Sequence, residues 1–394
     1  MNLRDYKTVA DRRTALEKET GVRLPNIGSF TLDESIASTR NCENMVGAAQ
    51  IPMGIAGPLK VKSLKSKVKS YFIPLATTEG ALVASVSRGC KAITESGGAA
   101  VDSHRVGATR GPVFRVDNLK QHDEIYRYLN TNLDELKRVA EATSGHLKLE
   151  KLLTRGVGHY RYVRFVFDTA DAMGMNMATI ATQALVTFIE KKFGVSCISV
   201  AGNFDTDKKP SWLNAIENRG MKAWAEVTMP SSVLKTVLKT TARSVYEVWL
   251  AKCMVGSALS GSMGFNAQYA NIIAAIFAAT GQDLGHIGEG SVGITMAEIV
   301  NEKDLYMCVT LPDLMVGTVG GGTGLGTQKE ALTILGVDGG NNGKNAQKLA
   351  EIIAAAVLAG EISLLASLSE GTLARAHQHL ARGAGEFSNN PILK

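Results

Sequence analysis

The sequence predicts an α+β protein with more than one folded unit, and three observations lead to this prediction. The chain has 394 residues, more than a single compact core usually serves. Its middle part, roughly residues 112–199, alternates strand-like runs with helical stretches. Longer helical segments follow, and the last of them is apolar at near-helical spacing. We therefore expect a small α+β module inside a larger, helix-rich protein.

The N-terminal part is expected to form a small helical cap followed by a β-hairpin. Residues 1–45 combine charged helical sequence with a turn-rich passage through Pro25 and Gly28. From Ile51 onward, glycines and prolines give way to the alternating sequence VKSLKSKVKSYFIPL, which is typical of a hairpin. This hairpin ends at ATTEGALVAS, so Glu79 is predicted to lie where a strand gives way to a helix.

The middle and C-terminal parts contain the remaining predicted elements. Strand-like runs in the module are GPVFRV, YRYVRFVFD and VSCISV. Helices are predicted over residues 122–143, 175–192, 231–255, 266–281 and 345–370. The fourth is rich in alanine and isoleucine, which permits close helix packing. The last helix stops before Gly371, a suitable C-terminal cap.

Charges and apolar runs argue against export and against a membrane span. The first 21 residues carry many charged side chains, which leave no room for the apolar core of a secretory signal. The most apolar stretches, residues 271–279 and 352–368, are short or interrupted by Glu361, whereas a spanning helix needs about 20 mostly apolar residues. We therefore expect a cytoplasmic protein with no membrane partner.

Cysteine, histidine and lysine patterns predict neither a metal site nor a nucleic-acid partner. Five scattered cysteines contain no Cys-x-x-Cys pair and suggest reduced thiols. The close pair His377 and His379 would point apart on a helix. A net charge of +6 suits anionic small molecules as readily as nucleic acid. The one basic cluster, Lys60 to Lys69, lacks interleaved aromatic residues and is interpreted as a solvated strand edge.

Two segments could bind an anionic ligand through their backbone. DAMGMNM, Asp171 to Met177, closes a strand and opens a helix, where free amides and Asn176 could face such a ligand; the alternative is a core-facing methionine ridge. GTVGGGTGLG, Gly317 to Gly326, lets backbone N–H groups approach phosphates closely. It matches neither the G-x-G-x-x-G nor the Walker pattern, so it indicates a phosphate or dinucleotide nearby, or only a flexible loop.

Three ionisable residues are candidates for chemistry. Lys208 lies in the loop DKKP, where a lysine fixed beside a carboxylate could polarise a carbonyl, although loop lysines are often only solvated. Asp283 follows an apolar helix whose C-terminus disfavours anions, which predicts a cationic partner such as Lys208. His377 follows the last helix in a polar stretch, where a plain surface histidine is the alternative.

Taken together, these segments resemble the 3-hydroxy-3-methylglutaryl-coenzyme A (HMG-CoA) reductases. The resemblance rests on the order and spacing of ENMVGAAQIPMGIAGPL, TTEGALVASVSRGCKAI, TRGP, DAMGMNM, DKKPSWLN, GQD and GTVGGGT, between about Asn41 and about His379. DAMGMNM and GTVGGGT are similar to class I, which eukaryotes and archaea share. The resemblance implies the four-electron reduction of (S)-HMG-CoA to (R)-mevalonate and coenzyme A with two NADPH, in the mevalonate pathway to isoprenoids.

The resemblance also implies an architecture. A large domain with a long central helix, residues 46–111 and 200–394, would be interrupted by a small ferredoxin-like domain that binds the dinucleotide, residues 112–199. A small helical region, residues 1–45, would precede both. The assembly would be a homodimer or a dimer of dimers with active sites at the subunit interface.

Residue roles follow from the same resemblance. The family's catalytic glutamate, lysine, aspartate and histidine fall on Glu79, Lys208, Asp283 and His377. Lys208 would stabilise the developing oxyanion, Asp283 would hold Lys208 and tune Glu79, Glu79 would protonate the substrate oxygen, and His377 would protonate the coenzyme A thiolate. Substrate contacts fall on Arg110, Asn203, Asp207, Lys209, Asn271 and, for coenzyme A phosphates, Arg88 and Lys239. Cofactor contacts fall on Ser144, Asp171, Met173, Gly174, Met175, Asn176, Met177, Gly317, Val319, Gly320 and Gly321.

The chain departs from the family pattern at two informative positions. Ala201 replaces a serine that contacts the substrate, and the Ser-Arg pair with which animal members select NADPH aligns with Ser144 and Gly145. His146 or Lys148 could supply the missing cation, and we expect NADPH rather than NADH. Without the resemblance, two other classes stay open: a dinucleotide- or coenzyme A-binding module without turnover, and a basic protein associated with nucleic acid.

Overall fold

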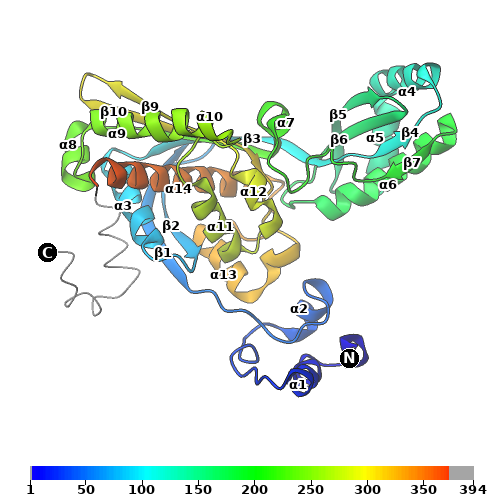
Figure 1. Ribbon diagram of the computed structural model, residues 1–394, viewed down its shortest axis with the longest axis horizontal. Helices are drawn as coiled ribbons and strands as arrows, with labels where there is room; N and C mark the ends of the chain where they lie inside the picture. The colour runs from blue at the N-terminus through cyan, green and yellow to red at the C-terminus, as the bar shows by residue number, and fades with distance from the viewer. Residues whose placement is uncertain (1, 372–394) are drawn as a thin grey trace.

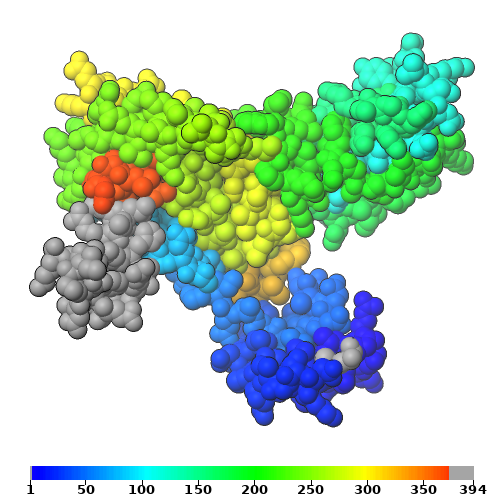
Figure 2. Space-filling model, in the orientation of Figure 1, coloured from blue at the N-terminus to red at the C-terminus, as the bar shows by residue number. Residues whose placement is uncertain are grey.

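The computed structural model describes residues 2–371 as a mixed α/β fold in which one long helix packs against a largely antiparallel sheet. Figure 1 shows a large body, a small module that extends from one end of it, and N-terminal helices on another side. In Figure 2 the same three parts form distinct bulges of the molecular surface.

Six strands build the sheet of the body: β1 (Met53–Ser63), β2 (Lys69–Ala76), β3 (Ala99–Arg110), β8 (Arg219–Met229), β9 (Ile294–Val300) and β10 (Asp304–Leu314). β1 and β2 form the predicted antiparallel hairpin, with Met53 opposite Ala76. β3, β8, β10 and β9 pair antiparallel in that order, and the short β1–β3 pairing is parallel. Leu305, Met307 and Val309 of β10 are buried at every second position, as expected for a strand with one face on a core.

Helices of the body are α3 (Leu82–Glu95), α7 (Trp212–Glu217), α8 (Ser231–Val233), α9 (Ala242–Trp249), α10 (Ser257–Ser260), α11 (Tyr269–Thr280), α12 (Ile287–Gly290), α13 (Gly326–Leu335) and α14 (Lys344–Ser369). Two π-helical segments are η2 (Leu234–Leu238) and η3 (Leu250–Gly256), and two 3-10 turns are η4 (Leu284–His286) and η5 (Gly321–Gly324). α14 contacts β3, β8 and β10 of the sheet as well as α3, α9 and α11. The predicted last helix is therefore the centre of the main core.

α14 is buried because its sequence is apolar all round rather than on one face. Among the residues that the structure describes, it is the one helix long and apolar enough to cross a membrane, yet 83% of its apolar window is buried inside the molecule. It is thus a core helix of this fold. α3 approaches it closely at Gly89, where an added Cβ would lie 1.9 Å from the carbonyl oxygen of Ala359.

The small module has its own hydrophobic core. It consists of β4 (Val113–Arg115), α4 (Leu119–Thr131), α5 (Leu133–Glu141), β5 (Lys148–Val157), β6 (Tyr160–Asp168), α6 (Met175–Phe193) and β7 (Ser196–Ser199). Phe114, Phe165 and Phe167 are fully buried there. β3 leaves the body and pairs through Ala108 to Arg110 with β6, so one strand belongs to both sheets.

The N-terminal helices form a third, small cluster. They are η1 (Leu3–Asp5), α1 (Val9–Thr20) and α2 (Glu34–Arg40), with Val9 and Met45 among the few buried side chains. The Thr8 side chain caps α1 by accepting from Asp11 N at 3.0 Å, and Gly21 ends it in a left-handed conformation.

Two predicted helices are each divided, so both predictions were wrong in their continuity. The stretch 122–143 is split into α4 and α5 at Asn132, which leaves the helical conformation (φ −120°, ψ 38°) and donates its side chain to the Tyr128 carbonyl at 3.1 Å. The stretch 231–255 is interrupted after η2, where Lys239 has φ 60° and Thr241 caps the start of α9 by accepting from Ser244 N.

Candidate active site

A cavity of about 860 Å³ lies where the module, the body and the N-terminal segment meet. Its walls include residues 172–177 at the start of α6, the loop that holds Asp207 and Lys208, the end of α11 with Asp283, and the glycines at 317 and 320–322. The four motifs DAMGMNM, DKKP, GQD and GTVGGG, far apart in the sequence, therefore surround one space.

The two candidate cofactor segments lie directly side by side. Ala172 and Val319 form a parallel β-bridge, and Thr318 N donates to the Asp171 carbonyl at 2.8 Å. A Cβ on Gly317 would lie 2.4 Å from Met173 N, so only glycine permits this approach. The Asp171 carboxylate is buried and accepts from the backbone of Asn341, Gly343 and Ala346 near the start of α14. Its side chain therefore fixes the two segments to the central helix.

The start of α6 suits an anionic ligand. Gly174 is its N-cap at φ 87°, with no side chain capping the first turn. A Cβ on Gly174 would lie 2.3 Å from Thr169 Cγ2, so the position requires glycine. Uncapped amides at a helix N-terminus, together with a glycine-rich wall opposite, are the donors that a pyrophosphate needs, and these residues therefore fit a dinucleotide. Ser144 lies beside this helix start, with Oγ 3.7 Å from Met177 Sδ.

Lys208 and Asp283 form an ion pair at one wall of the cavity, with Nζ 2.8 Å from Oδ2. This contact confirms the predicted cationic partner of Asp283. Burial alone would raise the pKa of Asp283, but hydrogen bonds from Lys208 and from Gly285 N and the nearby positive charges lower it. Asp283 also begins the turn η4, so its carboxylate caps a new helical turn after α11 has ended.

The loop that carries Lys208 is strained and rigidly supported. Asn203, Thr206 and Lys208 all have positive φ values, between 58° and 63°. Such conformations cost about 1–3 kcal/mol each and persist only where the surroundings enforce them. Lys208 N donates to Glu289 Oε2 at 2.9 Å, which is one such constraint. Lys209 points differently, with Nζ 3.2 Å from the Asp207 carbonyl.

A buried network of charges lies beneath this loop. Arg219 is fully buried and donates to Glu289, to Asp207 Oδ1 at 2.9 Å and to Thr109 Oγ1 at 2.7 Å. Burial would lower the pKa of Arg219, but the surrounding carboxylates raise it. The neighbouring Arg110 lies 3.4 Å from Asp207 Oδ2. Arg110 and Asp207 were predicted from the sequence, whereas Arg219 and Glu289 were not, since neither of these two lies in a motif with a local signal.

Glu79 lies elsewhere in the chain, away from Lys208. Asn271 Nδ2 donates to Glu79 Oε1 at 3.4 Å, and Asn271 is in the first turn of α11. Asp283 follows the other end of that helix, whose 12 residues span roughly 18 Å at 1.5 Å per residue. Asn271 lines a second cavity of about 670 Å³, where Lys252 adds a cation that the sequence analysis missed. The structure thus groups the candidates into two half-sites: one with Lys208 and Asp283, the other with Glu79 and Asn271.

The remaining candidates are dispersed. Arg88 donates inward to Ser363, with Nε 3.1 Å from Oγ and Nη2 2.6 Å from the carbonyl oxygen. Burial lowers the pKa of this guanidinium, and its side chain joins α3 to α14. Lys239 is exposed at the break after η2. His377 lies outside the described residues.

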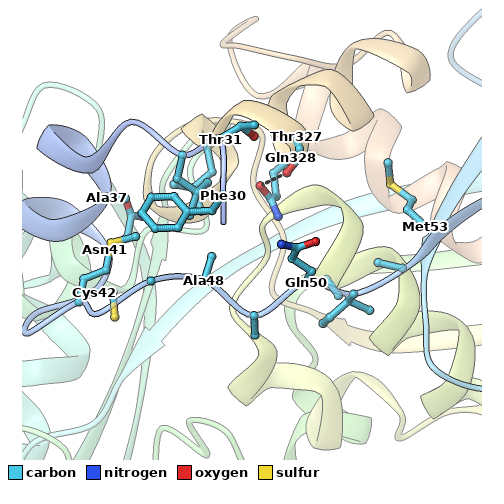
Figure 3. Close-up of a pocket in the computed structure, with 18 of the residues that line it drawn as sticks. Phe30, Thr31, Ala37, Asn41, Cys42, Ala48, Gln50, Met53, Thr327 and Gln328 are labelled. Atoms are coloured by element: carbon cyan, nitrogen blue, oxygen red, sulfur yellow. Dashed lines mark hydrogen bonds between the residues drawn. The ribbon is translucent and has the colours of Figure 1, made fainter. Parts of the chain in front are cut away.

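A third cavity, of about 690 Å³, adjoins the first and shares Asn41, Ile51, Leu325 and Gln328 with it. In Figure 3 Phe30, Asn41 and Cys42 belong to the N-terminal segment, and Gln328 belongs to α13. The N-terminal segment therefore forms a wall of the space next to the half-site of Lys208.

Comparisons with known proteins agree on one family. The family model described as "Hydroxymethylglutaryl-coenzyme A reductase" matches residues 8–382. The 3-hydroxy-3-methylglutaryl-coenzyme A reductase of Methanothermobacter thermautotrophicus is 48% identical over 96% of this chain and 94% of its own length. That of Methanocaldococcus jannaschii is 50% identical over 94% of this chain and 92% of its own, and that of Catharanthus roseus is 41% identical over 98% and 65%.

Solved structures agree in fold. A 3-hydroxy-3-methylglutaryl-coenzyme A reductase of Streptococcus pneumoniae superimposes with a TM-score of 0.69 at 21% identity, over 91% of this chain and 92% of that one. A structure of the class II reductase from the same organism, bound to NADPH in open conformations, gives 0.68 at 20% identity, over 92% and 87%. At these identities the likeness concerns the fold, including its mixed α/β architecture and antiparallel sheet.

Proposed function

The chain belongs to the hydroxymethylglutaryl-coenzyme A reductase family, and from this premise we propose which residues bind the ligands and which carry out each step of the reaction. The activity is the reduction of HMG-CoA to mevalonate. The observation that carries the site proposal is the cavity in which the Lys208–Asp283 pair faces the start of α6 and the glycines after Gly317. The cation that would polarise the carbonyl and the segments that would bind the dinucleotide then line the same cavity.

Class I is the proposed subgroup. Archaeal relatives share nearly half of their residues with this chain, and the plant relative shares 41%, whereas the bacterial solved structures share only about a fifth. The motifs DAMGMNM and GTVGGGT support the same assignment.

The proposed division of the chain is an N-terminal region of residues 1–45, a large domain of residues 46–111 and 200–394, and a ferredoxin-like cofactor domain of residues 112–199. Two separate hydrophobic cores, one around α14 and one around Phe165, support it. Five free cysteines and the burial of α14 support a cytoplasmic location.

NADPH is the proposed cofactor, held by residues 173–177 and by Gly317, Val319, Gly320 and Gly321. When bound, it supplies the hydride for each of the two reductions. His146 N donates to Ser144 Oγ at 3.2 Å, and Lys148 begins β5, so both candidate cations for the 2′-phosphate lie close to Ser144. The NADPH named for the streptococcal relative supports the same choice.

Lys208 is proposed to stabilise the oxyanion that develops on the thioester carbonyl. Its ammonium is paired with Asp283 and its backbone is fixed by Glu289, so little reorganisation is needed when charge develops. Arg110 and Asp207 extend the polar wall toward the substrate. Asn203 and Lys209, on the same loop, are proposed to contact the substrate as well.

The catalytic glutamate of each site is proposed to come from a second copy of the chain. Glu79 is about a helix length from Lys208 within one chain, and the two half-sites face different cavities. In a homodimer, the half-site with Lys208 in each chain would meet the half-site with Glu79 in the other chain. Two complete active sites would result. Glu79 would then protonate the substrate oxygen, and His377 would protonate the departing thiolate. Arg88 and Lys239 stay the proposed coenzyme A contacts.

The test is turnover of HMG-CoA by the purified protein with NADPH and, separately, with NADH. We expect two NADPH oxidised per mevalonate formed, because a thioester becomes an alcohol through two hydride transfers. A lower KM for NADH than for NADPH would overturn the cofactor proposal. Cofactor binding without any turnover would favour the binding module instead.

A further inference from the structure

A buried histidine lies directly behind the Lys208–Asp283 pair. His286 ends η4, is fully buried, and contacts Glu289 Oε1 through Nδ1. Among the described residues its Nε2 has no hydrogen-bond partner, yet it lies 3.6 Å from Asp283 Oδ2 and 4.0 Å from Asp207 Oδ1. Three carboxylates therefore surround one imidazole ring, two from the segment of η4 and α12 and one from the loop of Asp207.

The charges around the ring decide which nitrogen carries a proton. Glu289 accepts from Arg219 and from Lys208 N, so it acts as a carboxylate acceptor, and we assign Nδ1 of His286 as the donor in their contact. Arg219 Nη1 also lies 3.5 Å from this Nδ1. A deprotonated Nε2 would then direct its lone pair at the oxygen of Asp283. Two acceptors facing each other are unfavourable here, because the ring of His286 is fully buried and its Nε2 cannot turn to water. A second proton on Nε2 turns the same contact into an attraction.

Other charged groups packed around this cluster are balanced among themselves. Arg219 also pairs with Asp207, Arg110 approaches Asp205 and Asp207, and the pKa of the buried Asp313 is raised by its burial. The carboxylate of Asp283 thus lies between the ammonium of Lys208 on the cavity side and the imidazole ring of His286 on the buried side.

We infer that His286 is a positioning residue: its imidazolium holds Asp283 from behind and leaves the ammonium of Lys208 free to be shared with the substrate oxygen. Without the second cation, Asp283 would attract Lys208 alone and compete with the developing oxyanion. Because Glu289 also binds the backbone of Lys208, the ring and the lysine loop are held as one unit. The inference rests on the proposed roles of Lys208 and Asp283.

The test is His286→Gln, which keeps a polar side chain beside Glu289 but cannot become charged. We expect kcat to fall about tenfold to a hundredfold, with the KM for HMG-CoA nearly unchanged, because the effect reaches the substrate only through Lys208.

The matched control is His122→Gln. His122 is also buried, but its Nε2 contacts the Gly158 carbonyl at 2.7 Å inside the small module. The same chemical change there should leave kcat unaltered. If His286→Gln keeps the original kcat, the positioning role of His286 is overturned.

A second readout needs no turnover. Nitrogen-15 NMR of the histidine rings should show an imidazolium signal that moves in the Asp283→Asn variant. A neutral ring at that position would overturn the inference even if the His286→Gln protein does not fold. Absence of HMG-CoA turnover by the unaltered protein would instead count against the proposed function, since the NMR result does not depend on it.

Discussion

At the scale of residues, the chemistry of the cavity wall depends on the ion pair of Lys208 with Asp283, whose Nζ and Oδ2 lie 2.8 Å apart. Lys208 and Asp283 were paired in advance because an anion after the end of a helix requires a cation. Arg219, His286 and Glu289 were not identified, since each stands alone in the sequence and acquires its role only when β8, η4 and α12 pack together. Burial and pairing of isolated charges depend on tertiary structure and leave no local signal.

Lys208→Ala tests the charge at the cavity wall. Two unit charges about 4 Å apart at an effective dielectric of about 20 interact by roughly 4 kcal/mol, which corresponds to about a thousandfold in rate. We therefore expect kcat to fall by about that factor while the thermal midpoint changes little, because the side chain is partly exposed. Steady-state kinetics and a thermal melt measure the two effects, and a rate within tenfold of the original would exclude the oxyanion role.

At the scale of elements, apolar periodicity predicted the positions of α6, α11 and α14, and alternation predicted the β1–β2 hairpin. It failed where a polar side chain competes with the helix, as Asn132 and Thr241 do. Strands β3 and β8 were not identified because alanine occupies several of their inward positions, and this small residue carries little strand signal. Strand β10 was not identified either, although its inward residues Leu305, Met307 and Val309 alternate as in a strand.

Gly89→Ala tests the packing of α3 on α14. The new methyl group would meet the backbone of Ala359 at 1.9 Å, and backbone cannot rotate away as a side chain can. Overpacking of a core costs about 1–3 kcal/mol and sometimes more, so we expect a lower free energy of unfolding or an insoluble protein. Gly326→Ala, at a glycine with no atom within 4 Å of the added Cβ, is the control and should be neutral or slightly stabilising in urea titrations.

At the scale of the whole molecule, the sequence could not show that the candidate residues divide into two half-sites. Glu79 and Lys208 both lie in motifs of the same family. Within one chain, however, Glu79 contacts Asn271 at the start of α11, whereas Lys208 pairs with Asp283 beyond the end of that helix. Distances across a fold depend on how its elements pack, and a residue list does not contain that packing. Only the folded chain indicates which residues a second copy would contribute to the site.

Mixing two inactive variants tests the shared site. Glu79→Gln and Lys208→Ala should each be inactive alone, but a heterodimer would contain one site with both original residues. After subunit exchange at equal concentrations, half of the dimers are mixed and half of their sites are intact, so about a quarter of the original kcat should return. No recovery after verified exchange would place the whole active site within one chain.

The strand shared by the two sheets has a consequence for how the ligands influence each other. β3 ends in Thr109 and Arg110, which contact Arg219 and Asp207 under the lysine loop, and its last residues pair with β6 of the module. A dinucleotide that reduces the mobility of the module would therefore also reduce the mobility of the lysine loop, which is proposed to contact the substrate. Linkage is reciprocal, so the affinity for each ligand should increase when the other is bound, by the same factor.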